Sequence, residues 1–228
     1  MLRTLALTGA LLANAALGQT VDAGVETPAE EAPHSKTLAP LHVDIKGTLD
    51  TDILLLYVEL GASADLALLK LGPGTLGVGA SFDVGFCGSF CWAFSALTQL
   101  DYWQHFYSPM ARLRYDIPLP AARASPTEKI NAYGFLMGGV VITSMGLSTK
   151  NGTIKVEGND ASVGIGIGGG AQYFFTSNVF GGAEATFRYA RGKYTWRVVI
   201  GSYELKGNED TWSLTGFNLK FMIGVRLP

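Results

Sequence analysis

The chain has 228 residues, of which 48% are hydrophobic and only 16% are charged, and it contains 29 glycines. An average soluble domain has about 25% charged residues and about 7% glycine, so this composition favours a protein whose outer surface faces lipid. The formal net charge of −2 gives no support for nucleic-acid binding, and the length suits one domain after a short leader.

Residues 1–18 have the pattern of a cleavable secretory signal. Arg3 supplies the positive start, residues 5–12 form a short apolar run, and Ala16-Leu17-Gly18 fits a small-residue cleavage site. The apolar run is too short to span a bilayer. Residues 19–40 are rich in Ala, Pro, Glu, Ser and Thr, and they predict a flexible periplasmic leader that could end in a strand.

Eight strand-like runs follow from residue 41. In the second run a helix would carry Glu59 and Asp65 into lipid, where charges are costly. As a strand, the even positions from Leu54 to Leu68 form an apolar face and the two charges share the other face. No clear turn separates the first two runs. The eight runs are 41–50, 54–71, 75–87, 99–117, 130–149, 154–176, 179–204 and 211–227.

The connections between these runs alternate in character. Residues 72–74, 118–126 and 176–178 form turns without long polar insertions, whereas longer excursions are expected near 87–98, 150–153 and 205–210. Outer-membrane barrels show this asymmetry between short periplasmic turns and longer outside loops. Within 150–153, the pair Asn151-Gly152 predicts a type I′ hairpin turn.

The last run shows the clearest alternation. Every second residue between 215 and 227 is apolar or Thr, while Lys220 and Arg226 lie on the opposite face. Only helices and closed barrels satisfy the backbone in lipid. The sequence therefore predicts an all-β fold, a transmembrane antiparallel up-and-down β-barrel over 41–228 with eight strands, or ten as the alternative.

Side-chain alternation also assigns the interior of this barrel. It predicts a lumen charge network of five acids and five bases, although one β-bulge would reverse the faces beyond it. An eight-stranded barrel is just wide enough to be filled by side chains, and buried charges need partners. Two interpretations stay open: a salt-bridged plug, or a polar ligand path or narrow channel. The predicted network is Glu59, Asp65, Asp83, Arg112, Arg114, Asp116, Glu184, Arg188, Lys220 and Arg226.

Two cysteines, Cys87 and Cys91, are four residues apart. Export favours a disulfide that closes a small loop. Free thiols are the alternative, and a metal site is a weaker one because no histidine lies within ten residues. Aromatic residues near strand ends predict an interfacial girdle, with a ligand-stacking surface as the alternative. They are Trp92, Phe94, Tyr102, Trp103, Phe106, Tyr107, Tyr173, Phe174, Phe175, Tyr194, Trp196 and Trp212.

A catalytic site is hard to assemble from this sequence. His105 and Ser108 are the close His/Ser pair of the barrel region, but at a spacing of three they face opposite sides of a strand. The glycine-rich run 164–170 alternates with Val and Ile, so it indicates a strand and not a phosphate-binding loop. We expect no enzyme activity and no cofactor or metal.

Three stretches resemble the small bacterial outer-membrane β-barrel family of the OmpA-like and OmpW-like kind. Residues 168–176 look like the family's usual strand end, residues 183–189 look like its next strand, and the final alternation looks like its assembly-signal strand. That strand presents Phe217, Leu219, Phe221, Ile223, Val225 and Leu227.

The resemblance implies a location in the outer membrane, with insertion by the barrel-assembly machinery and helper chaperones of the periplasm. A structural or surface-interaction role with a charge-plugged lumen is the leading expectation, and the outer loops would carry any recognition. A porin-like narrow pore or carrier for small solutes is the alternative. A lipid-modifying outer-membrane enzyme is the third.

Overall fold

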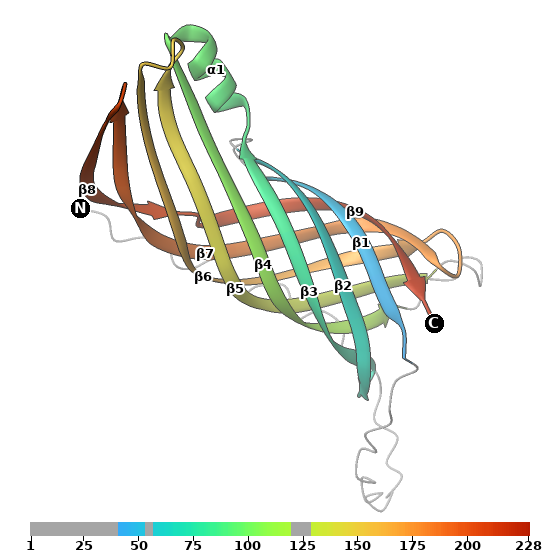
Figure 1. Ribbon diagram of the computed structural model, residues 1–228. Helices are drawn as coiled ribbons and strands as arrows, with labels where there is room; N and C mark the ends of the chain where they lie inside the picture. Colours follow the sequence, from blue (N-terminus) through green and yellow to red (C-terminus); the bar gives the residue numbers. More distant parts are fainter. Residues whose placement is uncertain (1–40, 53–56, 120–128) are drawn as a thin grey trace, which may run out of the picture. The chain divides into compact units, whose positions relative to one another are not determined.

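The computed structural model describes residues 41–52, 57–119 and 129–228, so the predicted signal (1–18) and leader (19–40) lie outside the described residues. The described residues form one antiparallel sheet and one short helix (Figure 1). The elements are β1 (Val43–Asp52), β2 (Tyr57–Leu71), β3 (Gly74–Cys87), α1 (Ser89–Leu97), β4 (Leu100–Leu119), β5 (Lys129–Thr149), β6 (Ile154–Phe174), β7 (Val179–Ile200), β8 (Tyr203–Ser213) and β9 (Gly216–Leu227).

The sheet closes into a ring because β9 pairs with both β1 and β7, and β7 pairs in turn with β6. β8 and β9 together form the eighth strand of this ring. Arg191 pairs with Ser213 of β8 and Arg188 pairs with Gly216 of β9, so one register continues through the junction. The Leu214 amide also donates to the Ala190 carbonyl at 2.9 Å. The predicted eight-stranded antiparallel barrel is therefore confirmed.

The ring has an apolar outside and a polar inside. On β9, Phe217, Phe221 and Ile223 point outward and are 57–66% exposed, while the intervening Lys220 is buried. This period of two is the expected pattern for a strand between two environments. The predicted assembly-signal residues therefore lie on the outer face, namely Phe217, Leu219, Phe221, Ile223, Val225 and Leu227. No helix in the described part of the chain is long and apolar enough to cross a membrane.

The two ends of the barrel differ. The loop end carries α1 and the β5–β6 and β7–β8 connections, and the turn end carries the β2–β3 and β6–β7 turns. β4 to β7 have 20–22 residues each, about twice the length that a tilted strand needs to cross a bilayer. The pairing between β3 and β4 ends at His105, so β4 to β8 continue beyond the ring at the loop end.

One predicted side-chain orientation is wrong. A register shift between Ala67 and Leu69 reverses the alternation of β2, so that Ala67 is buried whereas Leu69 and Leu71 are exposed. Leu68 therefore does not continue the outward apolar face. The bulge inserts one residue, which is the event that alternation alone cannot detect.

Two predicted loops contain regular structure. The excursion expected at 205–210 is part of β8, because the chain already turns at Gly201, whose φ of +59° favours glycine. Charged residues there suggested a loop, but a strand beyond lipid can be polar on both faces. The excursion at 87–98 contains α1, a nine-residue helix.

The Asn151-Gly152 turn also differs from the type I′ prediction. The Gly152 amide donates to the Thr149 carbonyl at 2.8 Å, so Lys150 and Asn151 occupy the central positions. Gly152 follows them with a φ of +72°. A type I′ turn centred on Asn151 and Gly152 would need a hydrogen bond from the Thr153 amide to the Lys150 carbonyl. The connection between β5 and β6 instead turns one residue earlier.

Candidate functional site

The lumen is the candidate site, and all ten predicted charges lie in it. Eight are nearly fully buried, whereas the side chains of Asp116 and Arg226 are 17% and 24% exposed. The alternation of the strands positions them, because each comes from an inward position. They form two ion-pair clusters with no ion pair between them among the described residues.

The loop-end cluster consists of Asp50, Glu59, Asp83, Arg188 and Lys220. Arg188 pairs with Glu59 at 3.0 Å and with Asp83 at 3.5 Å. Lys220 pairs with Asp83 at 2.9 Å and with Asp50 at 3.3 Å. Three acids therefore surround two bases, and these contacts join β1, β2, β3, β7 and β9 across the lumen.

The turn-end cluster is larger and balanced, with four acids and four bases. Glu184 accepts from Lys46 at 3.0 Å and from Arg112 at 3.1 Å. Arg114 donates to Asp65 at 2.9 Å and reaches Asp116 at 2.5 Å. The members are Asp44, Lys46, Asp65, Arg112, Arg114, Asp116, Glu184 and Arg226.

Aromatic rings cover the cations of both clusters. The guanidinium groups of Arg112 and Arg114 lie 4.0 Å from the ring centres of Phe135 and Tyr133 respectively. In the loop-end cluster, the guanidinium of Arg188 lies 5.5 Å from the ring centre of Phe106. Cation–π contacts are strongest when they are desolvated, so these rings stabilise charges that have left water. The lumen is thus filled by a mixed ionic and aromatic core.

The sequence reasoning missed the charges of β1, namely Asp44, Lys46 and Asp50, which are 1–2% exposed. A signal was present, since these three residues and Thr48 occupy every second position opposite Ile45 and Leu49. No clear turn separates the first two strands in the sequence, so the inward and outward residues of the first strand were not assigned. Tyr133 was missed because a tyrosine in an apolar run resembles a core or interface residue.

Several aromatics predicted for an interfacial girdle lie inside the barrel. Phe106 and Phe174 are 0% and 5% exposed, and Tyr194 and Trp212 are 1% and 7% exposed. They pack with Phe180, Met110 and Met222 in the interior. For these four residues the girdle prediction is wrong, because they occupy inward strand positions. Phe174 lies at the turn end, whereas Phe106, Tyr194 and Trp212 lie toward the loop end.

The other predicted features are placed as follows. His105 packs edge-on against Phe86, which is on the outer face, whereas Ser108 is fully buried toward the lumen. The two therefore lie on opposite faces of β4. No cluster of His, Cys, Asp and Glu in the described ranges has the arrangement of a metal site.

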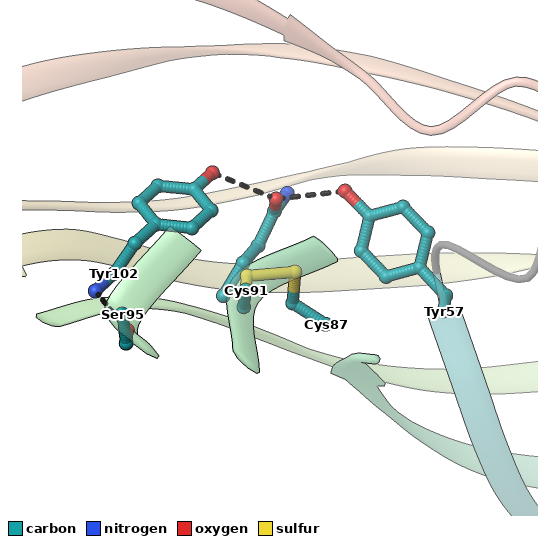
Figure 2. The surroundings of a disulfide bond; sticks show 6 residues. Tyr57, Cys87, Cys91, Ser95 and Tyr102 are labelled. Atoms are coloured by element: carbon teal, nitrogen blue, oxygen red, sulfur yellow. Dashed lines mark hydrogen bonds between the residues drawn. A yellow bond between two sulfur atoms is a disulfide. The ribbon is translucent and has the colours of Figure 1, made fainter. Parts of the chain in front are cut away.

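Cys87 and Cys91 form the predicted disulfide, with Cα atoms 5.7 Å apart (Figure 2). The bond ties the first turn of α1 to the end of β3. Further along, the Ser95 hydroxyl accepts from the Tyr102 amide at 3.2 Å, and α1 thus lies against the start of β4. Burial raises the pKa of the Tyr102 phenol, which keeps its proton and donates to Gln104 at 3.1 Å.

We expect the double variant Cys87→Ser/Cys91→Ser to loosen α1 and leave the ring intact. Opening a loop of this size removes about 2 kcal/mol of local constraint. Limited proteolysis within 89–97 should become faster. The folded ring should still give a gel mobility shift, that is, a different migration on a denaturing gel before and after heating. Equal proteolysis rates in the variant and the parent protein would show that Ser95 and the aromatic contacts suffice to hold α1.

A closed eight-stranded antiparallel ring with an apolar outer face and a charged interior defines a small transmembrane β-barrel. No protein-family model and no curated protein matches the chain. Solved structures similar to it include a major outer membrane protein of Thermus thermophilus, which is 14% identical in sequence. The match covers 81% of this chain and 98% of that chain, with a TM-score of 0.49. The N-terminal β-barrel domain of Pseudomonas aeruginosa OprF is 13% identical, with 82% and 97% covered and a TM-score of 0.42. Ail, the attachment invasion locus protein of Yersinia pestis, is 13% identical, with 82% and 96% covered and a TM-score of 0.39.

Proposed function

We propose that this protein is a structural or surface-interaction barrel of the bacterial outer membrane with a plugged lumen. The observation that carries the proposal is the complete pairing of the lumen charges: each of the thirteen cluster members has an oppositely charged group within 4 Å. Unpaired charges would be expected along an ion path, whereas oppositely charged pairs across the lumen favour a rigid filling.

The proposal includes the route and the surroundings of the protein. Residues 1–18 would direct export and be removed, periplasmic chaperones and the barrel-assembly machinery would insert the strands, and outer-membrane lipid would surround the apolar face. Recognition would reside in the part of β4 to β8 beyond the ring and in α1. There Trp92 and Leu97 are 77% and 86% exposed. Large exposed apolar side chains favour an interaction role. We propose no catalytic activity.

A second candidate, a narrow pore or carrier, is favoured by one observation. Buried hydroxyls of Ser63, Ser81, Ser108 and Thr186 have no hydrogen-bond partner among the described residues. Their strand positions place them between the two ion clusters. Buried polar groups generally bond to protein or to water, so this layer would suit water molecules.

Conductance across a planar lipid bilayer separates the two functions. We expect the purified protein, folded as judged by its gel mobility shift, to give no stable unitary openings. The physical reason is that an ion would have to displace the paired groups of both clusters. Reproducible openings of one size from the folded protein would refute the plug and favour the pore.

A further inference from the structure

β7 runs beside the junction of β8 and β9 (Figure 1). A hollow lies there, and all of its lining residues except the buried Trp212 are exposed. Its volume is about 300 Å³. Tyr189 and Arg191 of β7 form one wall, and hydroxyl-bearing residues of the neighbouring strand form the other. The lining residues are Tyr189, Arg191, Thr211, Trp212, Ser213 and Thr215.

Register explains why these groups face one another. Arg191 pairs with Ser213, and Lys193 pairs with Thr211 one step farther toward the loop end. Residues two apart share a face, so a column of Tyr189, Arg191 and Lys193 runs beside a column of Thr211, Ser213 and Thr215. The hydroxyls of Ser213 and Thr215 are 2.8 Å apart, so one donates to the other and the second keeps its proton free to donate outward.

Arg191 is the unusual member of this hollow. It is exposed, and it is the one arginine within the described ranges that has no carboxylate within 4 Å. Asp160 of the neighbouring strand β6 accepts instead from the Lys193 amide at 2.8 Å and from the Trp212 indole at 2.5 Å. A planar guanidinium beside hydroxyl donors is suited to phosphate oxygens.

The hollow lies at the edge of the apolar outer face. Directly toward the turn end, the rings of Phe187 and Phe217 pack with centres 4.9 Å apart, and Phe217 is 58% exposed. Tyr189 lies between these rings and Arg191, at the position that tyrosine favours at a membrane surface. A ligand that binds at Arg191 would therefore have an apolar surface immediately beside it.

From this arrangement we propose that the hollow binds the phosphate headgroup of an anionic membrane lipid, with an acyl chain along Phe187 and Phe217. The phosphate oxygens accept from the Arg191 guanidinium and from the hydroxyl of the Ser213–Thr215 pair whose proton is free. This inference rests on the proposed membrane location. A free phosphate would satisfy the same donors but would leave the apolar surface unused, so we assign the lipid.

The test uses the full mature chain folded in phosphatidylcholine vesicles that contain a minor fraction of phosphatidylglycerol. Native mass spectrometry then measures the fraction of barrels that retain one phosphatidylglycerol after release into mild detergent. Arg191→Gln should lower this fraction about fivefold, as expected for one cation at an anionic surface, and Arg191→Lys should keep most of it. Lys206→Gln removes an exposed charge from β8 outside the hollow and serves as the matched control.

The outcomes are distinct. Equal retention by Arg191→Gln and the parent protein, both with the gel mobility shift, would overturn the lipid site alone. Displacement of the lipid by millimolar inorganic phosphate would show that the hollow takes a free anion, which also overturns the lipid assignment. Failure of the parent protein to enter vesicles would refute the membrane location and the site together.

Discussion

Replacing Glu184 with Gln is expected to lower the free energy of unfolding of the barrel by about 3 kcal/mol. The carboxylate is 1% exposed and accepts hydrogen bonds from Lys46, Arg112 and Tyr133. The amide keeps the shape of the side chain but loses the charge. Lys46 and Arg112 would then be left with Asp65, which lies 3.5 Å from each and already pairs with Arg114 at 2.9 Å. The measurement is the urea dependence of the gel mobility shift in lipid vesicles.

Glu204→Gln is the matched control for this variant. Glu204 lies on β8 beyond the ring, its side chain is 60% exposed, and its ion pair with Arg197 spans 3.7 Å. Water screens such a pair, so its loss should change the unfolding free energy by about 0.5 kcal/mol or less. Equal effects of the two substitutions would mean that the turn-end cluster adds no stability through its charges.

Much of this fold could be predicted from the sequence because lipid and lumen impose opposite polarities on successive residues. Six of the eight runs matched described strands closely, and the alternation around Arg112 and Glu184 placed both correctly inside. This information is local, because the alternation within each strand alone indicates which of its residues face lipid and which face the lumen. The ring size followed from the number of such strands.

The errors arose where this local rule changes. Beyond lipid, β8 is polar on both faces, so Glu209 and Asp210 suggested a loop although they lie in a strand. Inside the barrel, Phe106 and Trp212 occupy inward positions that the alternation could have assigned, but their aromatic character suggested the interface. The pairing of charges was also beyond the sequence, because Arg188 and Glu59 are 129 residues apart and meet only in the closed ring.

That long-range contact gives the prediction with the largest effect: Arg188→Glu should prevent the chain from reaching the folded form. Asp50, Glu59 and Asp83 would then face a fourth carboxylate, with Lys220 as the one cation left among the five residues of their cluster. Like charges at this separation in a desolvated site repel strongly. The measurement is the yield of the fast-migrating unheated band after refolding into vesicles, for which Arg197→Glu, at a half-exposed site beyond the ring, serves as control.

The exchange variant Arg188→Glu/Glu59→Arg tests whether the pair itself is responsible. It restores opposite charges across the 3.0 Å contact between β2 and β7 and keeps the total charge of the cluster unchanged. Recovery should be partial, because Asn218 donates to Glu59 at 2.7 Å and has no acceptor in an arginine at that position. A normal folded yield from Arg188→Glu alone would contradict the role of the cluster. If the exchange variant recovers while the single variant does not, the two residues act as a pair that helps close the ring, since they connect strands far apart in the chain.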